Sequence, residues 1–496
     1  TSLLCIAWAI FQLLLPRIIV VDSIVVRAIH LAFAVGIGLL MTMTKTRALS
    51  KIRVGVIFIS VLSILYIIMD WEGIALRSGR PIFRDVCIGL AGVICLLEVT
   101  RRKIGLALPI VVGFFTVYIF LGPYMVDVFA FKGASITKYV TQVYLSTEGI
   151  YGIPLGVSAS IVYLFVLLGA MMERAGAGQF FINIALSVLG KYRGGPAKAA
   201  VASSGLMGMM SGSSIANVVT TGMFTIPLMK KVGYPPKKAA AIEVAASTDG
   251  QLMPPIMGAA AFIIAEYVNV PYFAVVKAAI IPALASNMAL FYITHLEALK
   301  LGLKGLSGPD IPNLVKTLKS GCHFLIPIAV LIIELFVLRH SPSLAAFWTI
   351  VVLMGLIVGQ EIFKGNGLHR AIVLIGEGVV SGSKNMVPVA LACASAGIIV
   401  GLVNLGIGGM MTQIVEVISN GNIFVLLGIT ALVSLILGMG LPTTATYIVM
   451  ASLTAPIIVA VSGSYGIVVP LIGAHLFCFY FGILADDTPP VGLASY

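Results

Sequence analysis

Charged residues are scarce in this chain, at 10% of 496 residues, whereas soluble domains carry roughly 25%. Hydrophobic residues make up 59%, and apolar stretches of about 18 to 25 residues recur along the whole length, as spanning a bilayer requires. The shortage of charge excludes a soluble globular protein. We predict an all-α polytopic membrane protein with about fourteen membrane segments and, in addition, a pair of re-entrant helical hairpins.

Several chemical signatures are also missing. The six cysteines stand singly in apolar runs without C-x-x-C spacing, so neither a zinc site nor a disulfide framework is indicated. No G-x-x-x-x-G-K-[ST] loop occurs, which excludes ATP hydrolysis by that route, and the six histidines lack metal-ligand spacing. The basic clusters lack the interleaved aromatic residues of a nucleic-acid surface. We expect no enzymatic activity, no use of ATP and no nucleic-acid partner.

The chain does have an excess of basic residues, with a net charge of +12, and they lie in short loops. Clusters follow predicted spans at Arg101–Lys103, at Lys230–Lys238 and at Lys300–Lys319. Basic loops of this kind face the cytoplasm. We therefore expect a multi-pass protein of a bacterial or archaeal cytoplasmic (inner) membrane, surrounded by lipid. The chain begins at Thr1 rather than at Met and stops where a new apolar segment starts, so we expect both ends to be trimmed.

Two segments about 230 residues apart echo each other, and each interrupts an apolar run with glycine and hydroxyl residues. Each is followed by an acidic residue and a double proline. The first set is Gly208–Ser214 with Asp249 and Pro254–Pro255, and the second is Gly438–Thr444 with Asp486–Asp487–Thr488–Pro489–Pro490. Paired broken segments in the two halves of a chain indicate the binding site of a secondary transporter built from inverted repeats.

The organisation that we predict has three parts. Residues 1–103 form a four-helix scaffold module with spans near 3–20, 24–44, 52–69 and 82–99. Residues 104–319 form a first repeat with a hairpin at 196–230, and residues 320–496 form a second repeat with a hairpin at 422–462. The loop Asp70–Arg80 is either a docking surface or an interfacial aromatic belt. The amphipathic stretch 135–147, with Tyr139, Val143 and Tyr144 on one side, is typical of a helix in the membrane interface.

The two breaks carry the candidate chemistry. A half-helix that begins at a break points free N–H groups at the cavity, which suits an anion, and hydroxyl and carbonyl oxygens suit Na⁺. The alternative is that glycine and serine only allow close helix packing. The oxygen-bearing side chains are Ser213, Ser214 and Asn217 in the first hairpin and Thr443, Thr444 and Thr446 in the second.

Asp249, Asp486 and Asp487 are ionisable groups in apolar surroundings, where such residues are costly and usually functional. Coordination of Na⁺ or H⁺ is the favoured interpretation, and capping of half-helices is the alternative. Gln251 either binds substrate or forms a hydrogen bond at a helix end. We interpret His475 as a packing histidine with a satisfied hydrogen bond.

Three runs of sequence carry a family resemblance, namely Gly194–Met229, Ala246–Ala260 and Leu484–Leu493. They resemble the large membrane subunit of the tripartite ATP-independent periplasmic (TRAP) transporters. The four preceding spans resemble the small membrane subunit fused to the large one, an arrangement similar to the branch served by TAXI-type binding proteins.

The resemblance implies Na⁺-driven uptake of a small carboxylate delivered by a soluble periplasmic substrate-binding protein, with an elevator motion of the hairpin domain. It implies two Na⁺ ions and a substrate carboxylate between the two tips, near Ser213, Asn217, Gln251, Thr443 and Thr444. Asn217 stands where several relatives have an acid, and Asp249 where many fused members have glycine, so the ligand set stays open. The first ion would lie among Ser213, Ser214, Asn217, Ser247, Thr248, Asp249 and Gly250, and the second among Thr443, Thr444, Asp486, Asp487 and Thr488.

Three rival functions stay open. A symporter of the same hairpin architecture would work without a binding protein, although the extra four-span module argues against it. A permease of the ABC type would require a separate ATPase, and the inverted hairpins argue against that. A membrane enzyme is the third, but no nucleophile–base pair or metal cluster supports it. The sequence does not identify the substrate, for which C4-dicarboxylates and 2-oxoglutarate are candidates.

Overall fold

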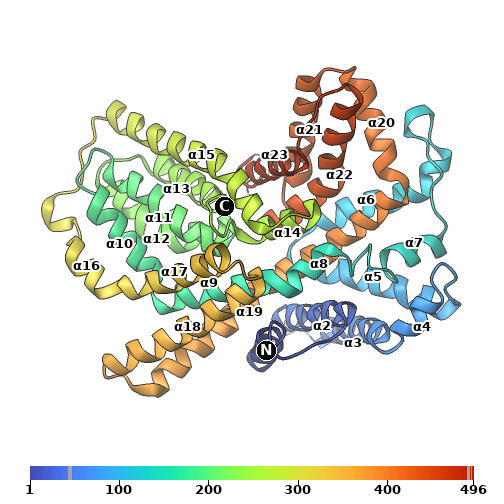
Figure 1. Ribbon diagram of the computed structural model, residues 1–496, viewed down its shortest axis with the longest axis horizontal. Helices are drawn as coiled ribbons and strands as arrows, with labels where there is room; N and C mark the ends of the chain where they lie inside the picture. Colours follow the sequence, from blue (N-terminus) through green and yellow to red (C-terminus); the bar gives the residue numbers. More distant parts are fainter. Residues whose placement is uncertain (43–46, 489–491, 493, 496) are drawn as a thin grey trace. The chain divides into compact units, whose positions relative to one another are not determined.

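The computed structural model describes residues 1–42, 47–488, 492 and 494–495, and within these residues the chain is helical with no strand (Figure 1). It divides into two compact units. Unit 1 comprises Thr1–Val162, Glu266–Asn269 and Ser383–Ala485, and unit 2 comprises Tyr163–Ala265, Val270–Gly382 and Asp486–Tyr496. The all-α class predicted from composition is confirmed.

The helices of unit 1 come from both ends of the sequence. They are α1 (Ser2–Leu14), α2 (Ser23–Met41), α3 (Arg47–Met69), α4 (Trp71–Leu76), α5 (Phe83–Lys103), α6 (Ala107–Leu121), α7 (Ile136–Val143), α8 (Ile153–Val157), α20 (Gly408–Ser419), α21 (Ile423–Gly438), α22 (Thr443–Ser464) and α23 (Leu471–Leu484).

The helices of unit 2 come mainly from the middle of the sequence, and two further helices are shared between the units. Those of unit 2 are α9 (Tyr163–Ala175), α10 (Ala177–Leu189), α11 (Gly195–Ser211), α12 (Ser214–Lys231), α13 (Pro236–Gly250), α15 (Tyr272–Lys300), α16 (Leu314–Gly321), α17 (Leu325–Ile332) and α18 (Pro342–Phe363). The shared ones are α14 (Gly258–Val268) and α19 (Gly367–Leu402).

Within the described residues, eight helical segments are long and apolar enough to cross a membrane, and six more apolar helices have 10–17 residues. The apolar runs predicted about fourteen membrane segments. The number of long segments is lower because several runs are divided into short helices. The predicted span 3–20 is one example. Helix α1 ends at Leu14, since Pro16 has no N–H with which to continue the helical hydrogen bonds.

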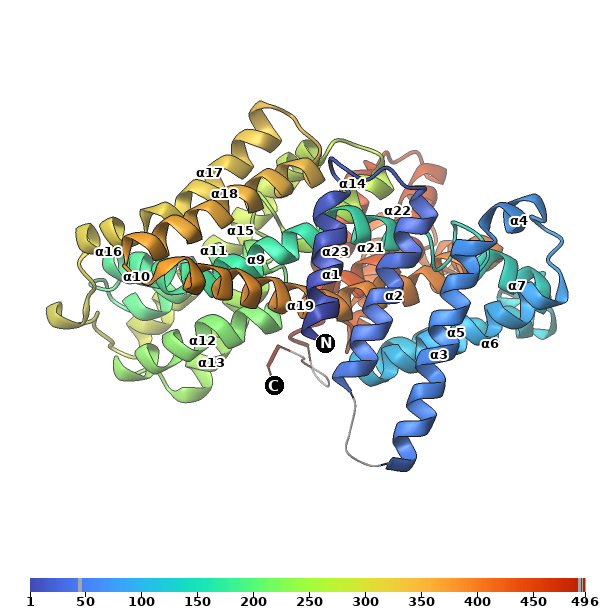
Figure 2. The same ribbon diagram turned by 90° about the horizontal axis from the view of Figure 1, so that it is seen from below.

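Buried hydrogen bonds join the N-terminal helices to later parts of unit 1. The ring of His30 on α2 is fully buried, with Nδ1 2.8 Å from the Gln12 amide nitrogen and Nε2 3.0 Å from the Ser158 hydroxyl. The hydroxyls of Thr100 on α5 and Ser395 on α19 lie 2.8 Å apart. Buried polar groups are costly unless paired, so these contacts fix one packing of the N-terminal helices. Figure 2 shows α2 and α3 side by side at this end of the chain.

The amphipathic stretch predicted at 135–147 contains a short helix, α7, that packs against α5. Tyr139, Val143 and Tyr144 are buried, as their shared side of the helix predicts. A β-carbon on Gly92 would lie 2.3 Å from the ring of Tyr144, so this glycine admits the tyrosine to the face of α5. A position in the membrane interface stays a prediction.

In unit 2, the helices α11, α12 and α13 pack against one another and lie side by side in Figure 1. Small side chains let them approach closely, because α11 contributes Ala197 and Ala200 to a core that also contains Met229, Tyr234 and Ala239. This bundle of three helices positions the first candidate site.

Candidate functional site: two broken hairpins

The first hairpin breaks at the position that the sequence predicts. Helix α11 ends at Ser211, Gly212 adopts a left-handed conformation with φ of +61°, and α12 begins at Ser214. The hydroxyl oxygen of Ser213 accepts a hydrogen bond from the backbone N–H of Ala216 at 3.3 Å, which caps α12. The side chain of Ser213 therefore serves the helix end.

Asn217 lies on the first turn of α12 and is 1% exposed. Its amide nitrogen donates to the backbone carbonyl of Ser204 on α11 at 3.0 Å. Its Oδ1 is buried and has no hydrogen-bond partner in the structure. Because only the amide nitrogen can donate to a carbonyl, this contact fixes which way the carboxamide points. Asn217 thus presents an unsatisfied buried oxygen, which is a suitable ligand for a hard cation.

The break after α13 lies directly beside this asparagine. A β-carbon on Gly208 would lie 2.7 Å from the Cα of Gly250, and a β-carbon on Gly250 would lie 2.3 Å from the carbonyl oxygen of Ser204. Glycine at both positions therefore allows α11 and α13 to meet through their backbones. The structure brings Asn217 close to Gly250, and the binding of an ion between the first tip and Ser247–Gly250 stays a prediction.

The C-terminal aspartates contact the residues of this first break. The hydroxyl of Ser214 donates to Asp486 Oδ2 at 2.9 Å, and the hydroxyl of Thr248 donates to Asp487 Oδ1 at 3.0 Å. Asp249 accepts instead from the hydroxyl of Ser286 on α15 at 2.8 Å. Unit 2 thus gathers hydroxyl, amide and carboxylate oxygens of the type that binds Na⁺.

The sequence did not predict these pairings for Asp486 and Asp487. Their assignment to an ion site with Thr443 and Thr444 stays a prediction, and so does the role of Thr488, which is partly buried. Pro489 and Pro490 of the same motif lie outside the described residues.

The second hairpin, in unit 1, has a similar break. Helix α21 ends at Gly438, Gly440 has φ of +78°, and α22 begins at Thr443 after Pro442. Thr443 and Thr444 are buried, and the hydroxyl of Thr446 donates to the backbone carbonyl of Leu441 at 3.3 Å.

The remaining predicted residues lie on α13 or at its end. Gln251 is the C-cap residue of α13 and is 1% exposed. The hydroxyl of Ser247 donates to a carboxylate oxygen of Glu243 at 3.3 Å. Sequence reasoning missed Glu243, which is 0% exposed. The signal was present, because Glu243 is the single acid in an otherwise apolar stretch from Ala239 to Ala246.

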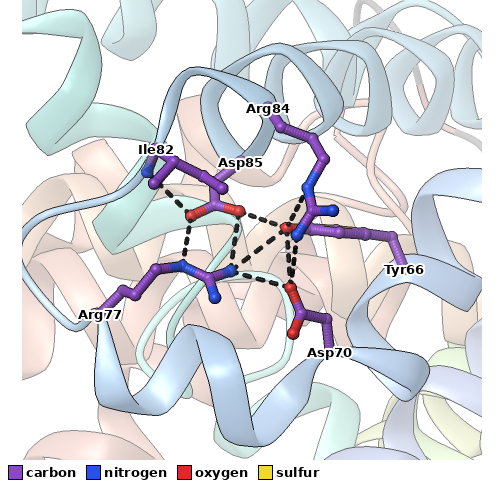
Figure 3. Close-up of polar contacts among 6 residues, drawn as sticks. All are labelled: Tyr66, Asp70, Arg77, Ile82, Arg84 and Asp85. Carbon is purple, nitrogen blue, oxygen red and sulfur yellow. Dashed lines mark hydrogen bonds and ion pairs between the residues drawn. The ribbon is translucent and has the colours of Figure 1, made fainter.

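A second polar cluster lies at the loop Asp70–Arg80 and is shown in Figure 3. The guanidinium of Arg77 contacts Asp70 at 2.9 Å and Asp85 at 3.1 Å, and Arg84 contacts Asp70 at 2.8 Å. The hydroxyl of Tyr66 donates to Asp85. These contacts tie the short helix α4 to the start of α5. Asp70 and Arg77 therefore hold the fold of the loop together.

Comparison with known proteins identifies the family. Residues 91–496 match the family described as "Tripartite ATP-independent periplasmic transporter, DctM component". A putative TRAP transporter large permease protein of Haemophilus influenzae is 24% identical over 349 residues, which are 68% of this chain and 76% of that protein. The sialic acid TRAP transporter large permease protein SiaM of Vibrio cholerae is 26% identical over 68% of this chain and 75% of its own length.

Other relatives align over shorter regions. The isethionate TRAP transporter permease protein DctMQ of Oleidesulfovibrio alaskensis is 26% identical over 40% of this chain and 31% of its own length. The uncharacterized protein y4mL of Sinorhizobium fredii is 27% identical, and the chain covers 43% of its length. Permeases of this family are transporters rather than enzymes, and they generally work with a periplasmic substrate-binding protein. The family match covers most of the sequence, and the part of the chain that the structure describes contains eight long apolar helical segments. This protein therefore belongs to the DctM family of TRAP transporter large permeases and is a multi-pass protein of the inner membrane.

Proposed function

We propose that this chain is the permease of a TRAP transporter that uses a Na⁺ gradient to import a small organic anion. A soluble periplasmic binding protein of the TAXI type delivers the substrate, and residues 1–103 act as the fused small subunit. The hairpin domain moves against a scaffold, as in an elevator, to give alternating access.

The observation that carries the Na⁺ coupling is the buried oxygen cluster at the first tip. Ser214 and Thr248 hold Asp486 and Asp487 there, and Asn217 adds a buried amide oxygen without a hydrogen-bond partner. Na⁺ fits this set, because hydroxyl, amide and carboxylate oxygens are hard ligands. The bound ion would supply positive charge beside the anion. Buried acids in a membrane protein are costly, which favours a transported cation as their partner.

The start of α12 supports an anionic substrate. Free backbone N–H groups and the positive end of the helix dipole at Ser214 favour negative charge. Similar proteins are described as TRAP transporter permeases for sialic acid, for isethionate and, in Pseudomonas aeruginosa, for C4-dicarboxylates. All of these are small organic anions, and we propose the same class for this chain.

Uptake by purified protein in proteoliposomes tests the proposal, with a TAXI-type binding protein from the same genome in the external solution. We expect uptake to need both that protein and an inward Na⁺ gradient, and we expect Ser214→Ala and Asp487→Ala to weaken the dependence on Na⁺. Ser464→Ala and Asp310→Ala are matched controls, because both side chains lie far from either break in the sequence and are exposed or partly exposed.

Three results would contradict the proposal. Equal Na⁺ dependence in Ser214→Ala, Asp487→Ala and the unmodified protein would show that the ion site is elsewhere. Uptake without the binding protein would favour a symporter of the same architecture. A requirement for ATP would favour a permease of the ABC type.

A further inference from the structure

The carboxylate of Glu243 is surrounded by hydroxyl groups from three helices. Ser204 on α11 donates to its Oε1 at 3.1 Å, and Ser247 on α13 donates to the same oxygen at 3.3 Å. On α12, Thr221 contacts Oε1 and Thr225 contacts Oε2. The side chain is 0% exposed, so water does not replace any of these contacts.

This carboxylate forms no ion pair with Lys, Arg or His among the described residues. Neutral hydroxyls can satisfy its hydrogen bonds, but they do not compensate a full negative charge. A buried charge without a counter-charge is strongly unfavourable, whereas a nearby cation would make it favourable. Such a carboxylate either takes up a proton or is stabilised by a cation nearby, and the buried Oδ1 of Asn217, which has no hydrogen-bond partner, favours the cation.

Two of the residues whose hydroxyls surround Glu243 also contact Asn217. The hydroxyl of Ser204 contacts the carboxylate, while its backbone carbonyl accepts from the Asn217 amide nitrogen at 3.0 Å. Thr221 also contacts the carboxylate, and its hydroxyl reaches the backbone carbonyl of Asn217 at 2.8 Å. The Thr221 hydroxyl has one proton and donates to one of these two oxygens at a time. The Asn217 carboxamide is oriented by its contact with Ser204, and its Oδ1, which has no hydrogen-bond partner, points away from Ser204.

We propose that Glu243 is a positioning residue for the coupling cation. It holds Asn217 through Ser204 so that Oδ1 faces the ion, and its negative charge raises the affinity of the site for Na⁺. This inference rests on the proposed Na⁺ coupling, but it concerns a residue that would not itself touch the ion.

The test measures Na⁺ binding without transport, by the rise in the thermal unfolding midpoint of the purified protein as NaCl replaces choline chloride. Substrate and binding protein are absent. We expect Glu243→Gln to need at least tenfold more Na⁺ for half of the rise, while its midpoint in choline stays equal or increases. Glu243→Asp keeps the charge, so the Na⁺ concentration that it needs for half of the rise should be closer to that of the unmodified protein. Glu361→Gln is the matched control, because Glu361 is also buried but contacts Lys364.

Other outcomes would overturn the inference or the Na⁺ coupling on which it rests. An unchanged Na⁺ requirement in Glu243→Gln, or a lower midpoint in choline with an unchanged Na⁺ requirement, would give Glu243 a purely structural role. If Glu243→Gln does not fold, Ser204→Ala decides, because it keeps the backbone carbonyl but breaks the link to the carboxylate. We expect its Na⁺ requirement to rise several-fold, and no rise would refute the link. If the unmodified protein shows no Na⁺-dependent rise, the Na⁺ coupling itself fails.

Discussion

The backbones of Gly212 and Gly258 touch with no side chain between them. A β-carbon on Gly212 would lie 2.6 Å from the Cα of Gly258, and one on Gly258 would lie 2.7 Å from the Cα of Gly212. Both residues have φ of +61°, a conformation that other residues rarely adopt. The first tip is therefore fixed against the start of α14 by a contact that only two glycines can make.

We expect alanine at either glycine to destabilise the protein. The left-handed conformation costs about 1–2 kcal/mol, and forcing a methyl group against backbone adds about 1–3 kcal/mol. The thermal unfolding midpoint in detergent measures the sum. Gly302→Ala is the control, because Gly302 has φ of +65° with nothing within 4 Å of an added β-carbon. If Gly212→Ala costs no more than Gly302→Ala, the close contact is not important for stability.

The hydrogen bond from Thr248 to Asp487 joins residues that are 239 positions apart. We expect Thr248→Val and Asp487→Ala to be non-additive, because each variant removes the same hydrogen bond. The coupling energy should be about 0.5–3 kcal/mol, as for other residues in direct contact. Denaturant titration of the single and double variants in Na⁺-free buffer measures it. Thr248→Val combined with Ser464→Ala should be additive, and additivity in the first pair would refute the contact.

Local features of the fold could be predicted from the sequence. The break at Gly212 follows from a glycine and hydroxyl cluster inside an apolar run, and the short helix α7 follows from its amphipathic pattern. Both depend only on neighbouring residues. The end of α1 was misjudged, although Pro16 gave a local signal for it.

The pairing of side chains could not be predicted in the same way. Ser214 and Asp486 are 272 residues apart, and no pattern in the sequence determines which break the C-terminal acids reach. Glu243 was missed because a single acid in a helix usually lies on a solvated face. Its four hydroxyl partners come from three helices, and their convergence depends on how those helices pack.

The loop cluster predicts a response to acid. Asp70 lies outside the membrane-spanning segments, and its pKa is held below the ordinary value of 3.8 by hydrogen bonds from Arg77 and then from Tyr66. A carboxyl group whose pKa is lower in the folded protein stabilises it above the unfolded value, and this contribution is lost as the pH falls through the lowered pKa. We therefore expect the loop to loosen only below about pH 3.8.

Pepsin can measure this loosening, because Leu76 and Phe83 beside the cluster are exposed apolar residues that it can cleave. Cleavage in this segment, normalised to a reference peptide, should rise as the pH falls below 3.8. Asp70→Asn should be cleaved readily already at pH values near 5, with little further change. Asp127→Asn, a change in another loop, should behave like the unmodified protein. If cleavage of Asp70→Asn rises with falling pH as steeply as cleavage of the unmodified protein, protonation of Asp70 is not the cause of the loosening.

The buried pair of Tyr447 and His475 supports the interpretation of His475 as a packing residue. The Tyr447 hydroxyl lies 2.8 Å from His475 Nδ1, and both side chains are at most 3% exposed. We expect Tyr447→Phe to lower stability by about 1–3 kcal/mol, because it leaves a buried ring nitrogen without its partner. Replacing both residues, with Tyr447→Phe and His475→Leu, should cost less than this single change, since no polar group then stays unsatisfied. Tyr465→Phe is the control, because Tyr465 is 44% exposed. If the double variant is the less stable one, or if Zn²⁺ raises the unfolding midpoint only when His475 is present, then His475 does more than pack.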